Sequence, residues 1–75
     1  MSALPPISAQ QFFLELFGSQ SAVRGAIIRR KVRDVEAYVG REAFLSEVRR
    51  RGFPVVENAG QFVIFCNNEP IRRLA

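Results

Sequence analysis

The sequence contains no histidine and no tryptophan, and it has only one cysteine. Histidine is the side chain that most often serves as a general base near neutral pH, and its absence removes the commonest catalytic arrangements. The single Cys66 excludes an internal disulfide, and without histidine it leaves only scattered carboxylates as metal ligands. The five glycines lie far apart, so no glycine-rich phosphate loop is present. We therefore expect no enzyme, no metal and no cofactor.

Acidic residues and long apolar runs are also scarce. Eleven Lys and Arg outnumber seven Asp and Glu, which gives a net charge of +4 and allows an anionic partner. Asp34 and Glu36 are two residues apart and Glu42 and Glu47 are five apart, so neither pair shares a helical face well. No apolar run is long enough to span a membrane, and the N-terminus lacks the features of a signal peptide. These features fit a protein of the reducing cytoplasm that has no membrane contact.

What the chain does have is apolar content, which reaches 48% with seven phenylalanines. This is enough for one compact core, so residues 1–75 are predicted to form a single small domain. The stretch Gln61–Asn67, QFVIFCN, is apolar at both alternating sets of positions and rich in aromatic and β-branched residues. Such a strand is usually covered on both faces, so we expect the rest of the chain to pack on it or pair with it. Cys66 then becomes a buried, inert thiol.

The N-terminal part combines a short extended lead, residues 1–7, with a well-marked helix. Ser8 and Gln11 match a capping box, and Ile7 and Phe12 occupy the two positions of a hydrophobic staple. Gly18 suits a left-handed position that ends the helix. A one-sided apolar stripe runs between these signals, made by Ala9, Phe12, Phe13, Leu16 and Phe17.

The next segment can be interpreted in two ways. Residues 19–25 are small and polar, which indicates mostly loop, and residues 26–32 indicate a short strand that begins near Gly25. A helical stripe also fits, although Gly25 inside a helix costs about 1 kcal/mol relative to alanine. The positions of that alternative stripe are Ala22, Val23, Ala26 and Ile27. We prefer the strand and leave the helix open.

The middle of the chain predicts two helices in place of one. In a single straight helix, the apolar residues before Gly40 would lie nearly opposite those that follow it. The phase break therefore predicts helices over Asp34–Val39 and Arg41–Arg51 with a bend at Gly40. Asp34 is expected to cap the first helix, and Gly52 to stop the second.

The C-terminal part predicts a β-hairpin. Phe53–Glu57 indicates a strand, and Pro54 places it at a sheet edge or stands at its start, because proline has no N–H to donate. Asn58–Gly60 suits a three-residue loop, and Gln61–Cys66 forms the return strand. The chain ends in a turn and a short basic tail, residues 71–75.

The resulting order is helix, strand, helix, helix, strand, strand, which defines an α+β fold with a C-terminal hairpin packed on the helices. This order, with the passage SEVRRRGFPVVENAGQFVIF, resembles the winged helix-turn-helix family. The resemblance implies that Glu42–Arg51 is a recognition helix, that Phe53–Cys66 forms the wing, and that the protein is a DNA-binding transcriptional regulator. The segment GAIIRRKVRDVEAYVG also resembles a group of short, uncharacterised proteobacterial proteins.

Nucleic-acid binding is the leading functional hypothesis, because guanidinium groups suit bidentate contacts with phosphate and guanine. The candidate residues are Arg29, Arg30, Lys31, Arg33, Arg41, Arg49 and Arg50, with Arg51, Arg72 and Arg73 as further cations. The competing interpretation assigns residues 49–51 to stabilisation of a helix end and residues 29–33 to a solvated strand face paired with acids. The hypothesis predicts that Arg29, Arg30, Arg41, Arg49 and Arg50 share a face free of carboxylates.

A protein-interaction or homodimerisation module is the alternative function. So small a domain has few ways to bury seven phenylalanines, and an exposed apolar patch would mark a contact surface. The edge strand Phe53–Glu57 could also accept a strand from a partner. The candidates for such a patch are Phe13, Leu14, Phe17, Phe53 and Phe65. It is equally open whether all the phenylalanines fill one core.

Overall fold

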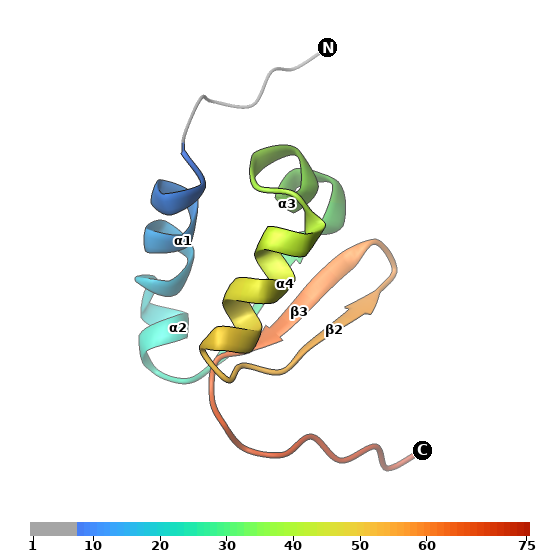
Figure 1. The fold of residues 1–75 in the computed structure, drawn as a ribbon. Coiled ribbons are helices and arrows are strands. Elements are labelled where there is room, and N and C mark those ends of the chain that lie inside the picture. The colour runs from blue at the N-terminus through green and yellow to red at the C-terminus, as the bar shows by residue number, and fades with distance from the viewer. Residues whose placement is uncertain (1–7) are drawn as a thin grey trace.

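A computed structural model describes residues 8–75, so the expected lead and the staple residue Ile7 lie outside the described residues. The fold is α+β, with helices and a three-stranded antiparallel sheet, as predicted (Figure 1). Its elements are α1 (Ala9–Phe17), α2 (Gln20–Val23), β1 (Ile27–Lys31), α3 (Val32–Tyr38), α4 (Arg41–Arg50), β2 (Val55–Asn58) and β3 (Gln61–Phe65). Within residues 8–75 no helix combines the length and the apolar character needed to cross a bilayer.

Strand β3 is the centre of the sheet, which has the order β1-β3-β2. Ile64 lies opposite Ile28 on one side and opposite Val55 on the other, so these three side chains share a face. On that face Phe62 and Ile64 are fully buried. The central role predicted for the apolar C-terminal stretch is therefore confirmed, and so is the edge position of β2.

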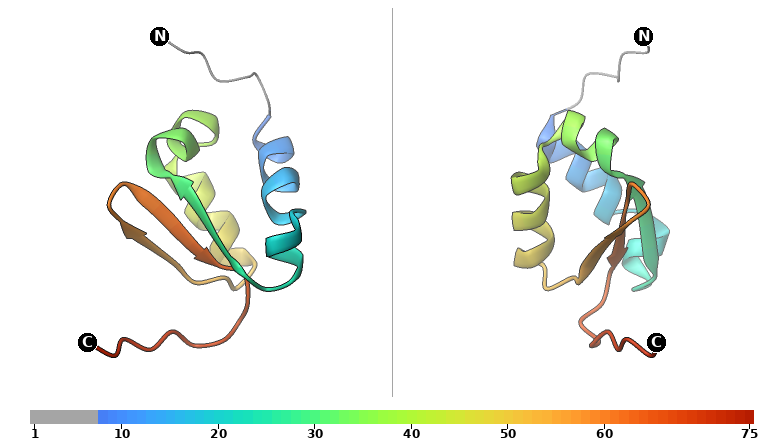
Figure 2. Two further views of the ribbon diagram at one scale, coloured as in Figure 1. Left: turned by 180° about the vertical axis from the view of Figure 1, so that it is seen from behind. Right: turned by 90° about the vertical axis from the view of Figure 1, so that its right-hand side faces the viewer.

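The described helices pack on one face of the sheet, as the two views in Figure 2 show. From α4, Phe44 stacks on Phe62 of β3 with ring centroids 4.7 Å apart. The core is completed chiefly by Val35 of α3, Val48 of α4, and Phe12, Leu16 and Phe17 of α1.

The opposite face of the sheet, which we call the outer sheet face, lies open. Val63 and Phe65 are only half-buried, and Ile27, which lies opposite Phe65, is 50% exposed. The expectation that both faces of the central strand are covered was wrong. The described helices are few and short, and they form a single layer that covers one side (Figure 2).

The start of α1 follows the predicted cap in part. The Ser8 hydroxyl accepts a hydrogen bond from the Gln11 backbone N–H at 3.0 Å, but the Gln11 side chain donates to Glu15 and so does not complete the box. Gly18 was predicted to be left-handed, but its φ is −90°, so this prediction was wrong. Ser19 explains the difference, because its hydroxyl caps a second helix directly, accepting from the Ala22 N–H. Helix α2 therefore replaces most of the predicted loop.

Strand β1 resolves the ambiguity of residues 26–32 in favour of the strand. Helix α3 then begins at Val32, immediately after β1, with no intervening cap residue. Asp34 lies within the first turn of α3 and does not cap it, which corrects the prediction. The Val32 N–H instead donates to the Gly60 carbonyl at 2.9 Å, so the hairpin turn satisfies this donor. Gly40, at φ 86°, separates α3 from α4, as the phase break predicted.

The hairpin turn is tighter than the predicted three-residue loop. Strand β2 begins at Val55 and includes Asn58, which pairs with Gln61, so the turn consists of Ala59 and Gly60 alone. Both residues have positive φ, 51° for Ala59 and 75° for Gly60, as a two-residue turn between right-twisted strands requires. Pro54 lies just before β2, and its carbonyl accepts from the Phe65 N–H at 2.8 Å.

Candidate nucleic-acid interface

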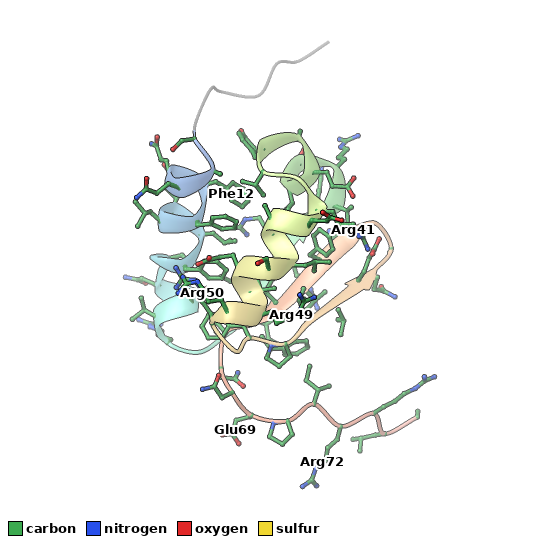
Figure 3. All side chains as sticks on the ribbon, viewed as in Figure 1. Phe12, Arg41, Arg49, Arg50, Glu69 and Arg72 are labelled. Atoms are coloured by element: carbon green, nitrogen blue, oxygen red, sulfur yellow. The ribbon has the colours of Figure 1, made fainter. Side chains whose placement is uncertain are left out.

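The predicted basic residues do not form one continuous surface. Arg29, Arg30 and Lys31 lie on β1, and Arg33 follows in the first turn of α3. The other candidates lie on α4. Figure 3 shows Arg41 at one end of that helix and Arg49 and Arg50 at the other.

Arg41 forms ion pairs with two carboxylates. Its guanidinium forms an ion pair with Glu57 of β2 and a second one with Glu36 of α3, the latter at 3.4 Å. It also lies over the Phe62 ring, 5.3 Å from the centroid. The hydrogen bond that Arg41 donates to Glu57, with a smaller contribution from Glu36, raises the pKa of Arg41 above its ordinary value. Arg41 thus joins α3, α4 and the hairpin, and its charge is already compensated.

Arg50 and Arg51 share one carboxylate at the C-terminal end of α4. Arg50 donates to Glu47 through Nε at 3.1 Å and Nη2 at 2.6 Å, and Arg51 Nε reaches the same carboxylate at 2.7 Å. The Arg51 guanidinium also lies over the Phe17 ring, 4.3 Å from its centroid, which connects α4 with α1. The Arg50 hydrogen bonds lower the pKa of Glu47; partial burial opposes this shift and Arg51 reinforces it. These cations therefore contribute to helix packing, and because two arginines share one carboxylate the cluster keeps a single net positive charge.

This cluster predicts a pH-dependent contribution to stability. Because the folded-state pKa of Glu47 is depressed, its stabilisation is present above the unfolded value, near 4.5, and is lost as the pH falls through the folded value. We expect Glu47→Gln to cost about 1 kcal/mol of unfolding free energy at neutral pH. Urea unfolding of both proteins at neutral and at acidic pH measures this cost. The difference should vanish in acid, and an equal difference at both pH values would contradict the assignment.

Helix α4 offers little free positive charge to a partner. Helical periodicity places Glu42, Ser46 and Arg49 opposite the buried Phe44 and Val48, and these three residues are exposed. Within residues 8–75 Arg49 forms no ion pair. The acid Glu42 lies on the same outward face of α4. The hairpin turn next to α4 carries no basic residue. The outward face of α4 therefore presents one cation and one anion.

Strand β1 is different, because alternate residues project onto the outer sheet face. Arg29 lies opposite Val63 and Lys31 opposite Gln61. The remaining polar position of this face is Asn58, whereas the neighbouring acid Glu57 has the opposite parity and pairs with Arg41. Among the strand residues on this side there is no carboxylate, and neither Arg29 nor Lys31 forms an ion pair within residues 8–75. The strand residues of the outer sheet face include no carboxylate, but of the five arginines predicted to share such a face only Arg29 lies there. The prediction that all five share one face free of carboxylates was therefore wrong.

Two further candidates flank this face. Arg30 has the opposite parity, and its side chain donates to the Arg29 carbonyl at 2.7 Å near a hollow bordered by Glu15. Arg33 borders an open hollow of about 410 Å³ together with Lys31. Arg33 forms no ion pair within residues 8–75, but Glu36 and Glu57 line the same hollow, and the single charge of Arg41 compensates only one of these two carboxylates.

The phenylalanines divide between the core and the surface. Phe17 is buried beneath Arg51, so it was wrongly expected to be an exposed candidate. Phe13 and Phe53 are half-buried against the core, whereas Leu14 is 65% exposed. Phe65 is half-buried on the outer sheet face between Ile27 and the start of β2. The sequence alone did not connect Phe65 with Arg29 and Lys31, because the pairing of β1 with β3 is a long-range contact.

No protein-family model, curated protein or solved structure matches this chain. Within residues 8–75 no three His, Cys, Asp or Glu side chains gather in a group that could hold a metal ion. Burial raises the pKa of the Cys66 thiol and so favours its protonated form. The surface geometry of the described residues therefore carries the information on function.

Proposed function

We propose that this chain is a non-catalytic domain that binds nucleic acid, with DNA as the leading candidate ligand. The observation that carries the proposal is the pair Arg29 and Lys31, which lies without acid partners on an open sheet face that has no carboxylate. Positive side chains that are not neutralised by the protein gain most from phosphate, because their contacts release counterions from the nucleic acid. Arg33, at the start of α3, extends the same positive edge.

We also infer a winged-helix-like architecture. The proposal is supported by the order of two helices, a strand, two more helices and a hairpin, in which the first strand pairs with the last. In this arrangement β2 and β3 form the wing, and α3 and α4 form the helix pair. Because Arg41 and Arg50 are already paired with acids, the proposed contact surface is centred on β1 and not on α4.

The proposal is tested by charge reversal with a matched control. Fluorescence anisotropy with labelled oligonucleotides, single-stranded and duplex, measures affinity over a series of salt concentrations. We expect the logarithm of affinity to fall linearly with the logarithm of salt, with a slope of about −2 to −3 for two or three phosphate contacts. The double variant Arg29→Glu/Lys31→Glu should lose at least about tenfold in affinity.

The control variant Arg72→Glu/Arg73→Glu makes the same change in net charge on the exposed tail, away from the sheet (Figure 3). It should lose less than about threefold, because no structured face positions these cations. Circular dichroism verifies that both variants fold. The proposal would be refuted if neither single-stranded nor duplex oligonucleotides bind at low salt, or if the two variants lose affinity equally.

A protein-interaction module is the second candidate, favoured by a hollow of about 420 Å³ between α1 and α4. Its apolar wall includes Phe13 and the exposed Leu14, and its polar wall is the Glu47 cluster with Arg50 and Arg51. A dimeric mass in solution, measured by light scattering, that becomes monomeric in Leu14→Gln would support this function. A monomeric mass at all protein concentrations would contradict a homodimerisation function.

A further inference from the structure

We propose that the ligand of the outer sheet face is a single strand of nucleic acid, with bases stacked on Phe65 and phosphates bound by Arg29 and Lys31. This inference rests on the proposed function and narrows it to unpaired over duplex nucleic acid. It is based on the apolar side chains that lie beside the basic residues on the outer sheet face. These side chains form a row made of Ile27, Val63 and Phe65.

The register of β1 and β3 brings the two kinds of side chain together. Phe65 lies opposite Ile27, and Arg29 lies opposite Val63, so the cations on β1 are next to Ile27 on their own strand and to Val63 and Phe65 on the neighbouring strand β3. Neighbouring strands are about 5 Å apart, and Arg29 and Lys31 are about 7 Å apart along β1. A single strand presents base faces and phosphates side by side. One chain can therefore cover the apolar row and neutralise the cations at the same time.

A duplex fits this surface less well. Its bases are stacked on one another inside the helix, and reading their edges requires an element that enters a groove. The outer sheet face is a three-stranded surface from which no described helix projects (Figure 2). The exposed helix α4, which could enter a groove, carries Glu42 beside Arg49 and has its other cations paired. Unpaired bases need no groove, since every base offers a flat face to an aromatic ring.

A second copy of the chain fits less well too. In a symmetric dimer the same patch meets itself, so Arg29 and Lys31 of one copy would approach the same positive side chains of the other. The outer sheet face has no carboxylate to compensate them. A polyanion with apolar faces satisfies both the cations and the row of exposed apolar side chains.

The test compares an oligothymidine, an oligouridine and a duplex DNA of equal length, by fluorescence anisotropy with the full chain. We expect either single strand to bind at least about tenfold more tightly than the duplex. Phe65→Leu keeps an apolar side chain but removes the ring, and it should lower single-strand affinity about tenfold. The salt slope should stay unchanged, because the phosphate contacts remain.

The matched control is Phe53→Leu, the same substitution at a half-buried phenylalanine that packs against the core and Phe17. It should change single-strand affinity less than about twofold once thermal unfolding shows that both variants are folded at the assay temperature. Similar losses in the two variants would overturn the stacking role of Phe65.

Three outcomes separate this inference from the proposed function. Duplex binding that equals or exceeds single-strand binding, with a loss in the Arg29→Glu/Lys31→Glu variant, overturns the single-strand inference and leaves the proposed function standing. If the unmodified chain binds no nucleic acid at all, both the single-strand inference and the proposed function are overturned. Binding of polyglutamate as tightly as oligothymidine, unaffected by Phe65→Leu, assigns the face to an acidic protein and overturns the inference.

Discussion

Replacing Phe44 with alanine should lower the free energy of unfolding by about 3–5 kcal/mol, the largest effect we expect from one substitution. Phe44 has no exposed surface, and its ring stacks on Phe62 with centroids 4.7 Å apart. It joins α4 to the central strand, so its removal leaves a cavity where the helical layer meets the sheet. A domain of this length has a total stability of order 5–10 kcal/mol, so the substitution should remove a large fraction of it.

Urea unfolding followed by far-ultraviolet circular dichroism measures this loss. The matched control is Leu14→Ala, which removes a large apolar side chain that is 65% exposed on α1. Its cost should stay within about 0.5 kcal/mol, because little buried surface is lost. A Phe44→Ala variant that loses no more than the control would show that the contact between α4 and β3 does not support the fold.

The parts of the fold that the sequence predicted correctly depend on local signals. Ser8 caps α1, Gly40 separates α3 from α4, and the apolar stretch around Ile64 forms a strand. Each of these features follows from the residue itself and its near neighbours, through a cap, a left-handed backbone or a pattern of alternation. Such signals survive folding because no distant contact competes with them.

The error at the start of α3 arises because a distant segment supplies what the local pattern was expected to supply, whereas the error in the hairpin loop is local. Asp34 was expected to cap α3, but the carbonyl of Gly60 satisfies the Val32 N–H and lets the helix begin two residues earlier. The hairpin loop is one residue shorter than predicted, because Asn58 pairs with Gln61 and leaves Ala59 in a left-handed conformation that alanine adopts rarely.

The candidate site shows the same division. The sequence identifies the cations but not their partners, because Arg41 meets Glu57 only when the hairpin folds against α4. The outer sheet face depends on the pairing of β1 with β3, whose paired residues are 30 to 38 positions apart in the sequence. Arg29, Arg30 and Lys31 are consecutive basic residues, so the sequence does not show which of them project away from the core.

Replacing Gly25 with valine should lower the free energy of unfolding by about 2–3 kcal/mol, the second large effect. Gly25 has φ 75°, a left-handed conformation that a β-branched residue strongly disfavours. The space is adequate, since an added Cβ would lie 3.5 Å from the Cys66 carbonyl oxygen, so the cost is mainly conformational. The backbone cannot relax easily, because the Gly25 carbonyl accepts from the Asn67 side chain at 2.9 Å and the Gly25 N–H donates to Ala22 at 3.0 Å.

The sign of the change in unfolding free energy caused by a second substitution, Gly25→Ala, decides between the helix and the turn for this segment. If Gly25 lay inside a helix, Gly25→Ala would stabilise the protein by about 1 kcal/mol, because alanine is the better helix former. In the left-handed turn between α2 and β1 the same substitution should instead destabilise it by about 1 kcal/mol. Gly25→Asn provides the control, since asparagine tolerates this conformation and should cost less than alanine. Thermal and urea unfolding of the three variants measure these differences, and a stabilising alanine would contradict the turn on which the start of β1 and the position of Arg29 depend.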